Sequence, residues 1–101
     1  MAGSTSETPV LGLLRSMTAE SVLATSLEDR EMMLVRIAAL VAVDAPALSY
    51  LLNLDAAAEI GFELDDIRGV LTAIAPIVGT TRVIAATDKI GEAMKLEADQ
   101  L

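Results

Sequence analysis

The apolar residues of this chain recur every three or four positions and nowhere alternate strictly with polar residues. A spacing near 3.6 residues places side chains on one face of an α-helix, whereas strict alternation is typical of strands. The pattern therefore predicts an all-α fold, a compact multi-helix bundle that occupies residues 9–101 as a single domain. The small polar residues at 1–8 are expected to be disordered.

Two short helical segments are expected at the start of this domain. The apolar segment 10–17, which Pro9 opens, predicts one or two helical turns that dock on the body of the protein. Thr18 is a candidate N-cap for a second short helix over 19–26, because its hydroxyl can accept a backbone N–H of the first turn.

The longest expected helix covers residues 27–43. Ser26 is its candidate N-cap, and Asp29, three residues later, is the candidate partner in a capping box. The first turn is charged, but the remainder is apolar on nearly every side. A helix of this kind lies at the centre of a bundle or is shared between subunits.

Proline and glycine mark the next helix boundaries. Pro46 is expected to be the first residue of a helix over 46–60, because the residue before a proline is pushed out of the helical region. Gly61 is expected to stop this helix in the left-handed conformation that is common after a helix. A further helix is expected over 64–75, and Pro76 should end or kink it.

The last expected helix follows the sequence Gly79-Thr80-Thr81 and runs to about Leu96. Thr80 or Thr81 is the candidate cap. Arg82 lies in the first turn, where a positive charge opposes the helix dipole, so an acid or an anion is expected near it.

The composition indicates a self-associating protein. The chain has 101 residues, of which 53% are hydrophobic, and its net charge is −8. So small a domain cannot hide this much apolar surface, so part of it is expected to face other copies in a homo-oligomer. The acidic balance and the dispersed basic residues argue against nucleic acid and anionic membranes as partners.

The location expected from the sequence is the cytoplasm. There is no cysteine, which suits a reducing compartment, and the start lacks the pattern of a secretory signal. No apolar run is long enough to cross a membrane. The acidic residues Glu59, Glu63, Asp65 and Asp66 form no metal-ligand pattern, so no metal site is expected.

Three segments resemble the carboxymuconolactone decarboxylase family, which also contains the alkylhydroperoxidase-D-like proteins. They are REMMLVRIAALVAV (30–43), AAAEIGFELDDIRGVL (56–71) and APIVGTTRVIAAT (75–87). The resemblance covers roughly residues 27–95 and lies in the order and spacing of the segments. It implies an alkylhydroperoxidase-D-like fold that assembles as trimers or hexamers.

The resemblance also implies that the reactive groups of the family are substituted. Redox members carry Cys-x-x-Cys-x-x-x-His on the helix that ends at the glycine matched by Gly61. Counting back places these positions at Pro46, Ser49 and Asn53. A thiol peroxidase needs one thiolate to attack the peroxide and a second thiol to resolve the sulfenic acid. The decarboxylase branch has histidine where this chain has Asn53, and an amide cannot shuttle a proton near neutral pH.

What remains is a candidate pocket without a cofactor. Ser49 and Asn53 share a helix face, with Tyr50 adjacent. Arg36 is the one charge inside the apolar run at 32–43, so it should have a carboxylate partner, which is Asp44, an acid of a neighbouring subunit or an anionic ligand.

Each of these residues also has a purely structural interpretation. Arg36 can form an ion pair at a subunit contact, and Ser49 and Asn53 can bond nearby backbone or water. Tyr50 can pack with its hydroxyl at the rim of the core, and Asp44 can bond the free amides of the following helix.

Three functions are compatible with these residues. The first is a helical oligomer without thiol peroxidase chemistry that serves as a small-molecule-binding or structural module. The second is a cofactor-free lyase or decarboxylase-type enzyme on a small carboxylate, with Arg36 binding the anion and Ser49, Tyr50 and Asn53 orienting the substrate. The third is a subunit whose apolar helices pack on a different protein. The sequence leaves open whether the chain is an enzyme.

Overall fold

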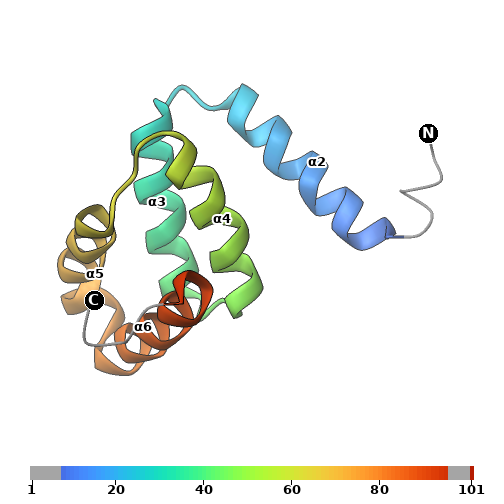
Figure 1. The fold of residues 1–101 in the computed structure, drawn as a ribbon. Coiled ribbons are helices and arrows are strands. Elements are labelled where there is room, and N and C mark those ends of the chain that lie inside the picture. Colours follow the sequence, from blue (N-terminus) through green and yellow to red (C-terminus); the bar gives the residue numbers. More distant parts are fainter. Residues whose placement is uncertain (1–7, 96–100) are drawn as a thin grey trace.

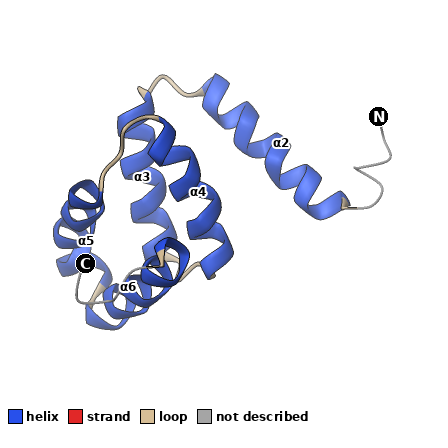
Figure 2. Ribbon diagram, in the orientation of Figure 1, coloured by secondary structure: helices blue, strands red, loops and turns tan. Residues whose placement is uncertain are grey.

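Helices make up all the regular secondary structure of the described part of the chain. The computed structural model describes residues 8–95 and Leu101, and there it contains helices and turns but no strand (Figure 2). The predicted all-α class is therefore confirmed. The segment expected to be disordered lies outside the described residues except for Thr8, and so does Leu96.

Four of the helices pack together and one extends away from them. In chain order the helices are α2 (Pro9–Ala24), α3 (Asp29–Ala42), α4 (Ala47–Glu59), α5 (Leu64–Val78) and α6 (Thr80–Met94). The four-helix body consists of α3 to α6, in which α3 contacts the other three helices and α6 also packs against α4 and α5. Figure 1 shows α2 extending from one end of α3, away from this body.

The core of the body is built around α3, as its apolar pattern predicted. Ile37 and Val41, one turn apart on α3, are fully buried, and so are Tyr50 on α4 and Ile90 on α6. Residues three and four apart lie on one face of a helix, so α3 presents a continuous apolar stripe to its neighbours. The core of the body is therefore mainly aliphatic, and both aromatic residues of the chain, Tyr50 and Phe62, are buried in it.

The N-terminal segment differs from the expectation of two short docked helices. It forms one helix of 16 residues, and none of its residues is buried. The Thr18 hydroxyl caps no helix but donates a 2.9 Å hydrogen bond to the carbonyl oxygen of Leu14. A threonine inside a helix can bond the carbonyl four residues back, so Thr18 is compatible with an uninterrupted helix.

The start of α3 also differs from the expected cap. The N-cap is Glu28 rather than Ser26, and the capping box joins Glu28 to Glu31 rather than to Asp29. The Glu28 backbone N–H donates to the Glu31 carboxylate at 3.0 Å. The two glutamates have the three-residue spacing that this reciprocal bonding requires, so the helix starts later than expected.

Helices α3 and α4 end with the same backbone motif. Gly61 has φ 81° and Asp44 has φ 55°, so both lie in the left-handed region. The residue after each one donates to a carbonyl five residues back, Phe62 to Ala57 at 3.0 Å and Ala45 to Leu40 at 2.9 Å. This is the Schellman motif. The prediction for Gly61 is confirmed, but Asp44 in the same position was not foreseen.

The prolines and threonines near the other helix ends occupy positions shifted from those expected. Pro46 is the N-cap of α4 rather than its first residue. Helix α5 does not end at Pro76 but continues to Val78. Pro76 and Thr72, whose carbonyl loses its usual N–H partner, are both exposed, so water can bond that carbonyl.

The turn between α5 and α6 is a single glycine. Gly79 has φ 90° and is both the C-cap of α5 and the N-cap of α6, which has no side-chain cap. The expected capping by Thr80 or Thr81 is therefore wrong. Both threonines lie in the first turn of α6, because the freedom of glycine at positive φ lets the chain reverse in one residue.

Candidate functional site

Arg36 connects the four-helix body to α2. Its guanidinium nitrogen donates to the Ser21 hydroxyl at 3.0 Å and to the Thr18 carbonyl at 3.5 Å. Arg36 is half-buried and forms no ion pair with any described carboxylate. The expected pairing of Arg36 with Asp44 is therefore wrong, since Asp44 pairs with Lys89. No other carboxylate in the described part of the chain neutralises Arg36, so its charge is available to an anion.

Arg36 and Asn53 line one shallow depression between α2, α3 and α4. Its volume is about 320 Å³, and Met17, Thr18, Ser21, Ala39 and Leu40 complete the lining. The Asn53 side-chain nitrogen donates to the Ser49 carbonyl at 2.8 Å, which ties the amide to its own helix. Two of the five candidate residues therefore meet, and α2, which the sequence did not place here, supplies part of the wall.

Tyr50 lies apart from this depression. Its side chain is fully buried in the core, not at its rim. Burial raises the pKa of the Tyr50 hydroxyl to about 12, and the negative charge of Asp44 adds to this effect. A phenol with so high a pKa stays protonated at neutral pH, so Tyr50 packs the core and exchanges no proton with a ligand at Arg36.

Ser49 shares α4 with Asn53, as the sequence predicted, and is partly buried. It is absent from the lining of the Arg36 depression. Its carbonyl, not its hydroxyl, makes the contact with Asn53. The helical spacing correctly placed the two residues on one face, but it did not bring the serine hydroxyl to Arg36.

Asp44 lies in a different depression, between the end of α3 and the start of α6. Its carboxylate accepts a 2.8 Å hydrogen bond from Lys89 and caps no amide of α4. The hydrogen bond and the charge of Lys89 lower the pKa of Asp44, and Arg82 lowers it further. Asp44 and Arg82 both line this depression of about 310 Å³. The acid expected near Arg82 is therefore present.

One cluster of the body was not foreseen from the sequence. Arg30 on α3 pairs with Asp66 on α5, and its guanidinium lies 5.5 Å from the centre of the Phe62 ring. The hydrogen bond from Arg30 lowers the pKa of Asp66, with a further contribution from the backbone N–H of Glu63. No local sequence pattern could have indicated this cluster, because Arg30 and Asp66 are 36 positions apart.

Many of the exposed apolar residues in the described part of the chain belong to α2 and α4. The exposed large apolar residues there are Val10, Leu11, Leu13, Leu14, Met17, Val22 and Leu23 on α2, and Leu48, Leu51 and Leu52 on α4. An open groove of about 330 Å³ separates the two helices. The composition had indicated an exposed apolar surface, but not its position.

Known proteins offer no match from which a function could be inferred. Comparison of the chain with protein-family models, curated proteins and solved structures gives no match. The resemblance to the carboxymuconolactone decarboxylase family therefore stays a prediction. Within residues 8–95 and Leu101, no three acidic side chains gather in a way that could hold a metal ion, and none of the helices could cross a membrane.

Proposed function

We propose that this protein is a carboxymuconolactone decarboxylase-like helical homo-oligomer that serves as a binding or structural module and lacks thiol peroxidase chemistry. The observation that carries the proposal is the exposure of α2. Leu13 is 61% exposed and Leu23 is 86% exposed, and no residue of the helix is buried.

An exposed helix of this kind needs a partner. Isolated helices of about 15 residues are marginally stable in water, and most helical stability comes from packing an apolar face. In α2 the apolar residues lie on several sides, as is typical of helices that are buried. The four-helix body buries none of these residues, so a further protein surface is needed to stabilise α2.

The proposed absence of peroxidase chemistry follows from the residues on α4. The chain contains neither cysteine nor histidine. Ser49 and Asn53 lie on the one helix that closes at Gly61, which agrees with the residue correspondence used in the resemblance. A serine hydroxyl without a base beside it is a weak nucleophile, so this helix offers no group for attack on a peroxide.

The proposal is tested by the mass in solution. We expect a homo-oligomer in sedimentation equilibrium at micromolar concentration, and no hydroperoxide turnover by protein stripped of metal and heme. A single-chain mass across the dilution series would contradict the assembly. Robust peroxide turnover by the stripped protein would contradict the chemical part.

A second candidate function is suggested by Arg36, which forms no ion pair with any carboxylate in the described part of the chain. A guanidinium beside apolar residues and an amide suits a small carboxylate that carries an apolar group, because arginine binds a carboxylate through two parallel hydrogen bonds. This candidate is a cofactor-free lyase or decarboxylase-type enzyme, or a carrier, for such an acid.

The Arg36 candidate can be tested by calorimetric titration with a panel of small aliphatic and aromatic carboxylates. Arg36→Gln should abolish the binding of any acid that the wild-type protein binds. Arg82→Gln is the matched control, because it removes the same charge from the other depression. If Arg36→Gln instead breaks the assembly into single chains, Arg36 is architectural and this candidate is lost.

A further inference from the structure

The groove between α2 and α4 has two apolar walls and is open between them. Its lining consists of Leu11, Leu14, Arg15, Thr18 and Ala19 from α2, and Leu48 and Leu52 from α4. Both walls come from one chain, yet they do not close on each other. A third apolar surface of helical shape would fill the space between them.

The apolar area here matches that of a standard homodimer interface. A leucine or valine side chain carries on the order of 100 Å² of apolar surface, so the ten side chains of α2 and α4, each about half exposed, offer on the order of 500 Å². A standard interface buries about 800 Å² per partner, of which about 65% is apolar in homodimers. The two areas are of the same order when all ten side chains are counted, and only four of the ten line the groove itself. A second copy reaches the full area when it contacts α2 on more than one side.

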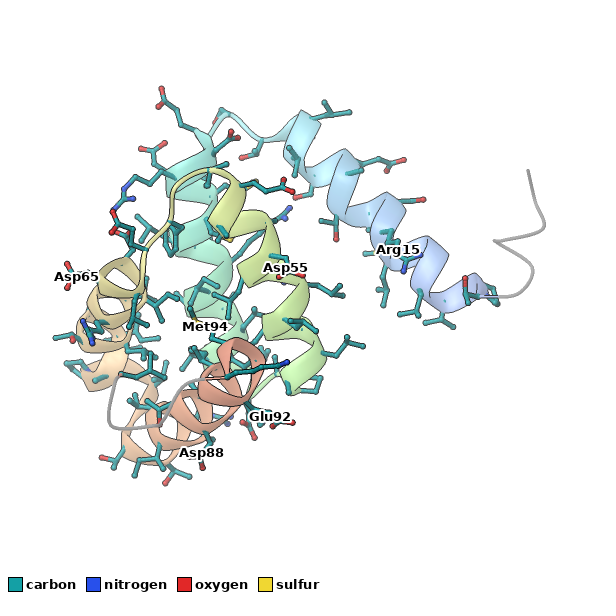
Figure 3. All side chains as sticks on the ribbon, viewed as in Figure 1. Arg15, Asp55, Asp65, Asp88, Glu92 and Met94 are labelled. Carbon is teal, nitrogen blue, oxygen red and sulfur yellow. The ribbon has the colours of Figure 1, made fainter. Side chains whose placement is uncertain are left out.

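The charge distribution favours another copy of this chain over a charged partner. Helix α2 carries Arg15 and Glu20, which cancel, and α4 is uncharged from Ala47 to Leu54. Figure 3 labels Arg15 on α2 and Asp55 on α4, and Asp55 follows the uncharged part of that helix. Two chains with a net charge of −8 repel each other least through these neutral surfaces.

We infer that α2 of one copy lies in the groove of a second copy, against Leu48 and Leu52, and that the exchange is reciprocal. Each copy supplies both the helix and the groove, so the contact is self-complementary, as a two-fold interface requires. The inference rests on the proposed homo-oligomer and adds the surface that forms it.

The absence of native cysteine allows a direct test. Leu14→Cys is introduced in one tagged chain and Leu52→Cys in another, and the two proteins are mixed, unfolded and refolded together. A short bis-maleimide then joins thiols that lie close together. We expect a covalent species of two chains that contains one tagged and one untagged copy. The matched control replaces Leu52→Cys by Ile77→Cys on α5, which is 86% exposed and lies outside the groove.

The outcomes separate this inference from the proposed function. A tagged–untagged species that forms with Leu52→Cys and not with Ile77→Cys supports the exchange. A native homo-oligomer that cross-links neither at this pair nor at Leu11→Cys with Leu48→Cys overturns the inference and leaves the homo-oligomer standing. Equal cross-linking of Leu14→Cys with Ile77→Cys also overturns the inference, because it would mean that the thiols meet by random collision. A wild-type protein of single-chain mass overturns both.

Discussion

Helix α2 and the four-helix body are built from similar aliphatic residues, but the body buries many of them and α2 buries none. In the body, α3 is covered by three other helices, and Ile37 and Val41 are completely removed from water. Helix α2 is as rich in leucine and valine, but none of its residues is buried. The difference comes from the number of neighbours that each helix has, not from its composition.

The contrast teaches that apolar periodicity identifies a helix but not its partner. The body can stabilise itself, because each of its helices packs against others of the same chain. The described polar contact of α2 with the body is made by Arg36 alone. A helix held by two hydrogen bonds and no buried side chain gains little stability from the four-helix body, so its apolar residues are left exposed.

The largest effect is expected in the centre of the body. Ile37→Ala should destabilise the protein by about 2–5 kcal/mol, because it removes buried methyl and methylene groups and leaves a cavity. In a domain of this size each kcal/mol corresponds to a melting-temperature shift of about 4–8 °C. Urea denaturation and thermal melts followed by circular dichroism measure it.

The control for this prediction lies on the same helix. Val35 is 56% exposed, so Val35→Ala should change stability by no more than about 0.5 kcal/mol. Equal losses in the two variants would mean that α3 is not the centre of the body, and the contrast with α2 would lose its basis.

The next effect is expected in α2 and concerns association. Leu11→Ala combined with Leu14→Ala should raise the dissociation constant of the oligomer by at least about tenfold, because about 1.4 kcal/mol is sufficient for that change and each leucine contributes more than this when fully buried. Sedimentation velocity over a dilution series measures the constant.

The double variant should leave the body of α3 to α6 folded, with a helical far-UV circular dichroism spectrum and a cooperative thermal melt. Ile77→Ala, on an exposed position of α5, is the control for the loss of apolar surface alone. An unchanged dissociation constant in the α2 variant would show that α2 is exposed in the assembly as well.

A smaller effect is expected at the helix joints of the body. Gly61→Ala should lower the free energy of unfolding by about 1–2 kcal/mol, because alanine is strained in the left-handed conformation at φ 81°. The added methyl meets no atom within 4 Å, so no steric clash contributes. Gly69→Ala is the matched variant, since its methyl also meets no atom within 4 Å and its backbone is helical.

Gly69→Ala should stabilise the protein by about 0.5–1 kcal/mol, since glycine is unfavourable inside a helix. Chemical denaturation of both variants gives the two changes. The two stability changes should have opposite signs. A loss of stability in both variants would mean that the left-handed backbone at Gly61 does not explain the cost of Gly61→Ala.

The smallest effect is expected at the surface pair of Asp44 and Lys89. Asn tolerates the left-handed conformation of position 44, so Asp44→Asn removes the charge without changing the backbone. The lowered pKa of Asp44 means that its stabilisation is present above the ordinary aspartate pKa of about 3.9 and is lost as the pH falls through the pKa of the folded state.

Thermal melts of the wild-type protein and Asp44→Asn should therefore differ slightly at pH 7, with the variant less stable. The difference should shrink as the pH falls below the ordinary aspartate value and disappear once the pH is below the lowered pKa of Asp44 in the folded state. A difference that stays constant with pH would assign it to the shape of the side chain and not to the charge of the pair.

The parts of the fold that were predictable depend on short-range chemistry. The left-handed glycine at 61, the break before Pro46 and the central position of the helix around Ile37 follow from backbone sterics and the 3.6-residue period. The caps were less predictable, because several Ser, Thr and Glu residues near each helix start compete for the same amides. Glu28 displaced Ser26, and Gly79 served where Thr80 or Thr81 was expected.

The candidate site was only partly predictable. The helical spacing put Ser49 and Asn53 on one helix, but it could not show that Tyr50, one position away, points into the core. Asp44 was a plausible partner for Arg36 by sequence distance, yet it pairs with Lys89, 45 residues later. Such pairs depend on how helices pack, and no local pattern records that.

The sequence by itself determined that the chain is helical, where most of its helices break, and that cysteine and histidine chemistry is absent. These properties depend on residues within a few positions of one another and on composition. Only the tertiary structure decided which apolar face is buried, which acid each cation meets, and that α2 is left outside the four-helix body. Those outcomes depend on contacts between distant segments, whose free energies arise only once the helices are packed together.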